Sequence, residues 1–226
     1  MKKWIIGIVV VALVAVVGGP FVYFHFIEGK APAKLSLSTA TVPATVPGTA
    51  RAPLAGPWEI GTGSTVDYRV TETLFGQSNT AVGKTSSVTG MMTISGTNVT
   101  AATFAVDMTK IASKQSQRDN QFQGRIMDTA DFPTATFTLT NPIALNPVPS
   151  DGVQRSYAAK GKLQLHGTTK DITLTLNTRR SGNVIQVQGD TPITFADYKI
   201  DNPSGGPASV GNSGQLEFLL ELQSAG

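Results

Sequence analysis

The chain has 226 residues, of which 40% are hydrophobic, enough for one globular domain with an appendage. It contains no cysteine, which excludes a disulfide framework, a cysteine nucleophile and a lipid-modified cysteine anchor. Its formal net charge is only +3 and its basic residues are scattered. Scattered charge is typical of a solvated surface, so no nucleic-acid partner is expected.

The first feature along the chain is an apolar run from Trp4 to Ile27 that contains no Asp, Glu, Lys or Arg. As a helix, this run would extend about 36 Å, against a membrane hydrocarbon core of about 30 Å. A cleaved signal peptide is the alternative, but the run is long for one and no small-x-small site follows it directly. Residues 1–27 are therefore predicted to form an N-terminal tail and an uncleaved transmembrane signal anchor.

Residues 28–57 form a segment rich in Ala, Pro and Thr, which make up 16 of its 30 residues. No apolar periodicity runs through it, so it is predicted to be a flexible linker. Its reach would be about 30 Å as a random coil and about 90 Å in polyproline form. Its threonines suit either O-glycosylation or a plain solvated linker. The folded domain is expected at residues 58–226.

Beyond Trp58, short segments alternate apolar and polar residues and are separated by Gly- and Asn-containing turns, the pattern of an all-β domain. The strands suit either a barrel or a sandwich, and closing the sheet into a barrel would remove its exposed edges. We predict eight strands, near residues 64–71, 88–95, 103–108, 135–140, 157–165, 172–177, 183–193 and 215–222.

One short helix is predicted between the third and fourth strands. Ser116 and Asp119 have the spacing of a capping box, and Phe122 and Ile126 fall on one helical face. Pro133 then prevents continuation of the helix. The segment is expected to lie as a flap across an apolar opening of the barrel.

The alternating residues give one uncharged, apolar face that points into the predicted barrel. An eight-stranded barrel is just wide enough to be filled by side chains or to hold one small ligand. Taken alone, the pattern favours a filled core, because a core stripe is the commoner cause of alternation.

Residues with catalytic chemistry are sparse. His166 precedes a Gly-Thr-Thr turn, where a structural hydrogen bond is favoured over catalysis. The sequence has no Gly-x-Ser-x-Gly motif, no pair of carboxylates with catalytic spacing and no cluster of metal ligands. We predict a protein that is not an enzyme and needs neither a metal nor another cofactor.

Several motifs recur in the order found in a known family. They are Trp58-Glu-Ile60, Val88-x-Gly90, the Arg118-Asp119 pair, Asp131-Phe132-Pro133-x-Ala135-x-Phe137 and Gly161-x-Leu163-x-Leu165-His166-Gly167-x-Thr169-Lys170. With them, the chain from about Trp58 to Leu222 resembles the YceI-like, polyisoprenoid-binding domain. The resemblance implies a lipocalin-like barrel of eight antiparallel strands with a long-chain isoprenoid or similar lipid in its lumen. It reverses the preference for a filled core. The segment from Leu74 to Lys84 departs from the family in being polar, and is expected at the rim.

The predicted function is non-catalytic binding or transport of an isoprenoid-type lipid, either a quinone or a polyprenyl chain, selected by length and shape. An envelope-stress or adhesion module with a filled barrel is the alternative, and a lipid-modifying enzyme would need a reactive cluster that the sequence does not show. The N-terminus is expected in the cytoplasm and the barrel outside it. Arg118 is expected either to bond rim carbonyls or to meet a ligand headgroup. The lumen and its mouth are expected to be lined by Tyr68, Phe75, Met92, Phe104, Val106, Met108, Phe122, Ile126, Phe137, Leu139, Leu163, Phe195 and Phe218.

Overall fold

Twelve β-strands form one antiparallel sheet in the computed structural model, which describes residues 30–37, 52–74, 76–205 and 208–225. A short helical segment, α3 (Ser116–Gln121) with the π-helical turn η4 (Phe122–Ile126), lies between the fifth and sixth strands. Two short 3-10 helices are η3 (Met108–Lys110) and η5 (Phe195–Tyr198). The strands are β1 (Gly56–Ile60), β2 (Thr65–Leu74), β3 (Gln77–Thr85), β4 (Val88–Ser95), β5 (Asn98–Asp107), β6 (Thr134–Leu139), β7 (Ile143–Ala144), β8 (Gln154–Leu165), β9 (Thr168–Ser181), β10 (Val184–Thr194), β11 (Ala208–Val210) and β12 (Ser213–Ser224).

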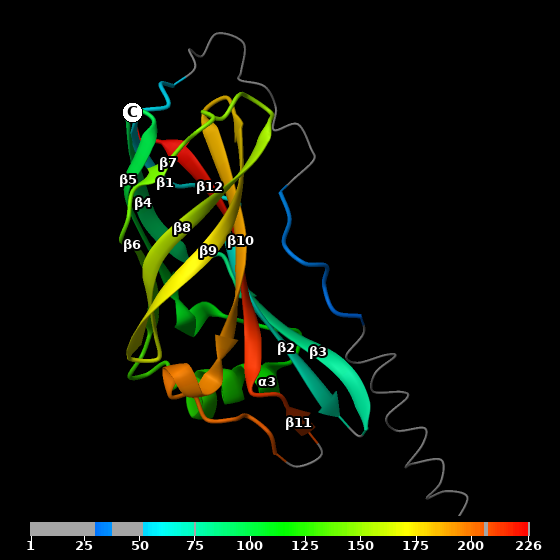
Figure 1. Ribbon diagram of the computed structural model, residues 1–226. Helices are drawn as coiled ribbons and strands as arrows, with labels where there is room; N and C mark the ends of the chain where they lie inside the picture. Colours follow the sequence, from blue (N-terminus) through cyan, green and yellow to red (C-terminus); the bar gives the residue numbers. More distant parts are fainter. Residues whose placement is uncertain (1–29, 38–51, 75, 206–207, 226) are drawn as a thin grey trace, which may run out of the picture.

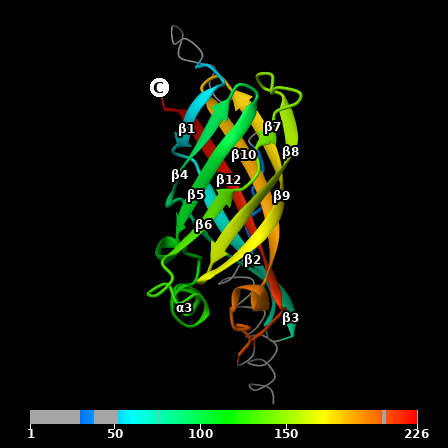
Figure 2. The same cartoon turned by 60° about the vertical axis from the view of Figure 1, so that its left-hand side comes forward.

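Eight of these strands close into a barrel in the order β1-β4-β5-β6-β8-β9-β10-β12. The ring closes at β1, because Trp58 pairs with Met92 of β4 on one side and with Ser224 of β12 on the other. Figure 2 shows the strands crossing the barrel obliquely, with α3 at the lower end. The prediction of an all-β, eight-stranded antiparallel barrel with one short helix is confirmed.

A long hairpin of β2 and β3 extends the barrel at its lower end. β1 pairs with the last residues of β12, and β2 pairs with its middle, where Val66 lies opposite Phe218. On the other side, β3 leads into β4 through Ser86 and Ser87, so each arm of the hairpin continues a barrel strand. Figure 1 shows this hairpin beside α3 and β11.

The predicted strands match eight of the observed ones to within a few residues at their ends, and four short or polar strands were missed. The largest miss is β3, since the polar segment after Leu74 was expected as rim and forms a strand instead. Its polar sequence has weak strand propensity, but nine of its residues pair with β2 in one continuous register. Pairing with a neighbouring strand has therefore overridden local preference.

The helix begins where it was predicted, with a different cap. Ser116 is already helical, and no side chain caps the preceding Gln115. Asp119 instead accepts a hydrogen bond from the backbone N–H of Ser113 at 2.7 Å. Ser113 Oγ in turn accepts a bond from the N–H of Gln115 at 3.1 Å. The carboxylate thus holds the approach to the helix, where the helix dipole also favours negative charge.

Residues 30–37, here called the strap, lie against the outside of the barrel. Arg69 of β2 donates hydrogen bonds to the carbonyls of Pro32 and Ala33, at 3.0 and 3.3 Å. The N–H of Leu35 donates to Glu217 of β12 at 3.2 Å, and Leu37 is buried. Part of the predicted linker therefore packs on the barrel wall (Figure 1).

The predicted anchor, residues 1–27, lies outside the described residues. Within the parts of the chain that the structure describes, no helix combines the length and the apolar character that crossing a membrane requires.

Candidate functional site

The lumen of the barrel contains two cavities arranged along its length. The upper cavity, within the eight-stranded ring, has a volume of about 140 Å³. The lower cavity, between the β2–β3 hairpin and the helix, has a volume of about 480 Å³. Protein interiors rarely leave voids larger than a water molecule, and ligand pockets measure about 300–1,000 Å³. The lower cavity falls within this range and the upper cavity below it, and both are larger than the voids that a filled core leaves.

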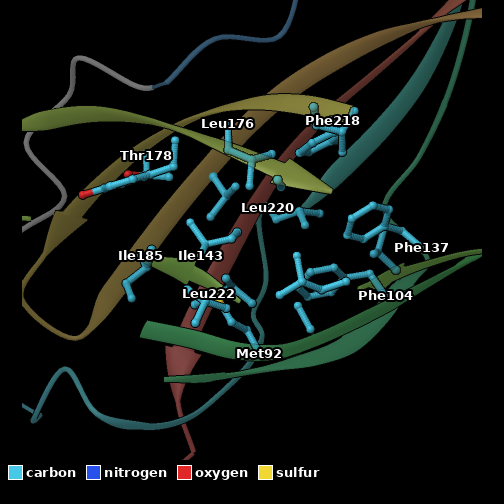
Figure 3. A pocket seen from close by; sticks show the side chains of 18 of the residues that line it. Met92, Phe104, Phe137, Ile143, Leu176, Thr178, Ile185, Phe218, Leu220 and Leu222 are labelled. Carbon is cyan, nitrogen blue, oxygen red and sulfur yellow. The ribbon is translucent and has the colours of Figure 1, made fainter. Parts of the chain in front are cut away.

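Several side chains that point into the lumen are only partly buried. Phe104, Phe137 and Phe218 occupy inward positions in β5, β6 and β12, yet each keeps some exposed surface. In a filled core of this size such residues would be enclosed on all sides. Their exposed surface faces the upper cavity, which all three line (Figure 3).

The upper cavity is almost entirely apolar. Its far end is covered by Leu54, Ile143 and Leu145, which come from the chain before β1, from β7 and from the loop after β7. Arg180 also borders it, but its guanidinium donates to the carbonyls of Gly182 and Ala52 and lies 5.4 Å from the centre of the Trp58 ring. A ligand here would meet hydrocarbon, and its binding would come from apolar burial.

The lower cavity has apolar walls and a polar rim. Phe122 of the helical segment stacks on Tyr68 of β2, with ring centres 4.9 Å apart and planes 10° from parallel. Arg118 forms an ion pair with Glu72 of β2, at 3.1 Å between Nη2 and Oε1. These two contacts, together with a hydrogen bond from Arg125 Nη2 to the carbonyl of Pro203 at 3.1 Å, hold the helical segment across the opening. The rim also includes Gln115, Gln117, Gln121 and Arg125.

The two cavities meet at a shared layer of side chains. Val66, Val106, Ala135 and Leu216 line both of them. In the three strands β5, β6 and β12, the phenylalanines of the upper cavity lie two residues away from this layer. The shared layer therefore places the two cavities next to each other along the barrel, one on each side of it.

A cluster of charges lies on the opposite face of β2 and β12, under the strap. Glu217 is 1% exposed, and its Oε1 accepts a hydrogen bond from Arg69 Nε at 3.1 Å. Asp67, directly opposite Glu217 in the register, is 4% exposed. Burial, with the neighbouring Glu217 charge, raises the pKa of Asp67 to about 6, while Arg69 and Lys84 act in the other direction. This carboxylate is costly to keep charged in the folded state.

His166 makes structural contacts. Its Nδ1–H donates to the carbonyl of Tyr198 at 3.0 Å, and its ring meets Phe132 edge-on at 4.7 Å. It lies in the left-handed backbone region, with φ of 48°, at the β8–β9 turn. The described residues contain no group of three or more His, Asp or Glu placed to hold a metal ion.

The structure brings the predicted site residues into the two cavities, apart from Phe75, which lies outside the described residues. Arg118, expected either in a structural bond or at a headgroup, forms an ion pair and also borders the lower cavity. The upper cavity is lined by Met92, Phe104, Val106, Phe137, Leu139, Leu163 and Phe218. The lower cavity is lined by Tyr68, Val106, Met108, Phe122, Ile126 and Phe195.

Sequence reasoning missed the residues that cover the upper end. Leu54 lies within the predicted linker, and Ile143 and Leu145 follow the fourth predicted strand without an alternating pattern. Isolated apolar residues among Pro and Asn are the only local signal for them. Only the tertiary fold shows that they cover a cavity.

A closed eight-stranded antiparallel barrel with an apolar lumen belongs to the class of small barrels that are wide enough to hold one ligand. The sequence profile of the YceI-like domain matches residues 58–222, and the chain belongs to the YceI-like family. No curated protein sequence matches the chain.

Solved structures share this fold. A polyisoprenoid-binding domain from Saccharophagus degradans, implicated in plant cell wall breakdown, superposes with a TM-score of 0.61 at 20% identity, covering 75% of this chain and 99% of that one. BcnA of Burkholderia cenocepacia superposes with a TM-score of 0.57 at 17% identity, covering 72% of this chain and 98% of that one. The YceI protein of Campylobacter jejuni superposes with a TM-score of 0.50 at 14% identity, covering 64% of this chain and 85% of that one. At these identities the similarity concerns the fold.

Proposed function

We propose that this protein binds one isoprenoid-type lipid, a quinone or a polyprenyl chain, in its lumen and carries it without chemical change. The observation that supports this most directly is the pair of neighbouring cavities with apolar walls, which share the lining residues Val66, Val106, Ala135 and Leu216. A long, slender hydrocarbon chain fits this shape. Membership in the YceI-like family, and the polyisoprenoid-binding domain that shares its fold, point to the same ligand class.

The polarity of the lumen gives the bound lipid a direction. The chain end would lie in the apolar upper cavity, and the polar end would lie at the lower rim near Arg118 and the glutamines of the helical segment. Apolar burial contributes about 25 cal/mol per Å² removed from water, less the cost of ordering a flexible chain. Affinity would therefore grow with the length of chain that reaches the upper cavity.

The protein would work at a membrane, anchored through residues 1–27 with the barrel on the outer side. The support is the sequence: a run of 24 residues without Asp, Glu, Lys or Arg at the start of the chain. Protease treatment of intact cells, compared with lysed cells, tests the location. Digestion of the barrel only after lysis of all membranes would contradict an exposed barrel.

The lipid itself is tested with the full-length chain, purified from the membranes of its expression host in a mild detergent. Native mass spectrometry, followed by organic extraction, is expected to find one lipid of one class per protein. An empty protein that also takes up neither added quinones nor added prenols would overturn the proposal. A stoichiometric two-chain phospholipid would keep a lipid-binding function and replace the ligand class.

A further inference from the structure

Three phenylalanines surround the lumen at the end of the upper cavity that adjoins the lower cavity. Phe104, Phe137 and Phe218, here called the ring girdle, are each two residues from a member of the shared layer. Figure 3 shows the three rings gathered at one end of the upper cavity, away from Thr178 and Ile185. A molecule that extends from the lower cavity into the upper one must pass them.

Each ring of the girdle lies over a glycine on a neighbouring strand. A Cβ atom added to Gly189 would lie 2.5 Å from Cζ of Phe218, and one added to Gly161 would lie 2.4 Å from Cε2 and Cζ of Phe137. One added to Gly90 would lie 2.7 Å from Cδ1 of Phe104. These distances are shorter than real Cβ contacts, so the rings occupy space that any other residue would fill. We call the three glycines the glycine seats.

The seats decide how far each ring projects into the lumen. With a glycine behind it, a ring lies back against the barrel wall, and with a larger residue it has to swing inward. The register supports this, because Gly189 lies directly opposite Phe218 and Gly90 directly opposite Phe104. Glycine is unfavourable within strands, which gives a reason to look for such a close approach.

We propose that the glycine seats set the bore of the lumen, and that they restrict its occupant to lipids with a single slender chain whose far end passes the ring girdle. This proposal rests on the proposed function and specifies its ligand class. The unequal cavities agree with it, since the space beyond the girdle is about 140 Å³ and the space before it about 480 Å³. Selection by length would then occur at the girdle.

Gly189 offers the cleanest test, because the three atoms nearest to a Cβ there all belong to the Phe218 ring, whereas backbone atoms are among the nearest at Gly161 and Gly90. Gly90 in addition has a φ of +144°. The matched control is Gly211→Ala, which adds the same methyl group where nothing lies within 4 Å. The full-length protein is titrated with a short prenol, farnesol, and a long one, solanesol, and binding is followed by native mass spectrometry.

Gly189→Ala is expected to weaken solanesol binding by about tenfold or more and to change farnesol binding by less than about threefold. Tenfold corresponds to about 60 Å² of apolar surface left in water. Gly211→Ala should behave as the wild type, and the double change Gly189→Ala with Phe218→Leu should recover solanesol binding, because the displaced ring is gone.

Unchanged solanesol binding by a folded Gly189→Ala protein would overturn the girdle proposal, and so would an equal loss of both prenols. Should Gly189→Ala fail to fold, Phe218→Trp narrows the lumen at the same place and leaves the glycine unchanged. It should likewise weaken solanesol binding and change farnesol binding little. A wild-type protein that binds neither prenol would instead overturn the proposed function.

Discussion

The two ends of the lumen are closed in different ways. At the upper end, β1 lies between β4 and β12 and completes a ring of backbone hydrogen bonds. At the lower end, β10 pairs with β9 only from Val184 to Gln188, and the helical segment covers the cavity through side-chain contacts. The upper end lies within a ring that β1 completes through backbone hydrogen bonds, whereas the helical segment at the lower end is held by side-chain contacts, among them the Phe122–Tyr68 stack, the Arg118–Glu72 ion pair and the Arg125 hydrogen bond to the carbonyl of Pro203.

The largest expected effect is at the upper end. Trp58 is completely buried, its Nε1–H donates to the carbonyl of Leu54 at 2.9 Å, and Arg180 lies over its ring. Trp58→Ala should lower the free energy of unfolding by about 3–5 kcal/mol, measured by urea denaturation. Glu59→Ala, at the exposed neighbouring position, should change it by less than about 0.5 kcal/mol. Equal effects would show that Trp58 does not hold the ring closed.

The next largest effect is on binding at the girdle. Phe137→Asp places a carboxylate in the apolar upper cavity, and prenol affinity should fall by about a hundredfold or more. Thr138→Asp makes the same charge change one residue along, on the exposed face of β6, and should leave the affinity unchanged. The measurement is prenol titration of variants that show native circular dichroism. Intact binding by a folded Phe137→Asp protein would remove the lumen as the binding site.

A smaller effect is expected at the lower end, on rates. Phe122→Ala removes the stack on Tyr68, which should lower the free-energy barrier to prenol release by about 1.4 kcal/mol. Release should then be about tenfold faster. Asn120→Ala, exposed on the same helix, is the control. Stopped-flow transfer of prenol to acceptor vesicles gives the rate. If both variants release at the wild-type rate, the helical segment is not the gate.

The smallest expected effect is on the pH dependence of stability, at the outward-facing Asp67 of β2. The pKa of Asp67 is raised from its usual 3.8 to about 6, so the folded protein holds this proton more tightly than the unfolded chain does. Proton binding to Asp67 therefore adds to the free energy of unfolding at low pH, and this contribution is lost as the pH rises from about 4 to about 6. Asp67→Asn should stabilise the protein by about 1 kcal/mol at about pH 8, after allowance for solvent screening, and by less at about pH 4. Thermal unfolding at the two pH values measures it, and a gain that is equal at both would contradict this assignment.

Alternation in the sequence was sufficient to predict the all-β fold and the shared face of the phenylalanines, whereas the barrel was predicted from the resemblance to the YceI-like domain. Phe104, Phe137 and Phe218 lie in segments with a clear period of two, and that period fixes which face they share. Whether this face surrounds a hollow or a solid core depends on the volumes of all eight strands together. The pattern alone favoured a solid core, whereas the structure contains two cavities.

The missed parts depend on contacts between distant residues. β3 is a strand because β2 lies beside it, and Glu72 meets Arg118 across 46 positions of sequence. The glycine seats were likewise not predicted, because a glycine in a strand suggests a close approach but does not show which ring will cover it. Such features are set by register, which a single sequence does not reveal.

If residues 1–27 span a membrane as proposed, the strap would limit the distance between the barrel and that membrane. Lys114, just before the helix, donates to the carbonyl of Lys30 at 3.5 Å, so the strap begins beside the lower end. Only Glu28 and Gly29 separate Lys30 from Ile27, the last residue of the predicted anchor. Three residue steps span about 10 Å at most. The tether would then be short, with the lower rim close to the headgroups, and a lipid could move between bilayer and lumen without crossing bulk water.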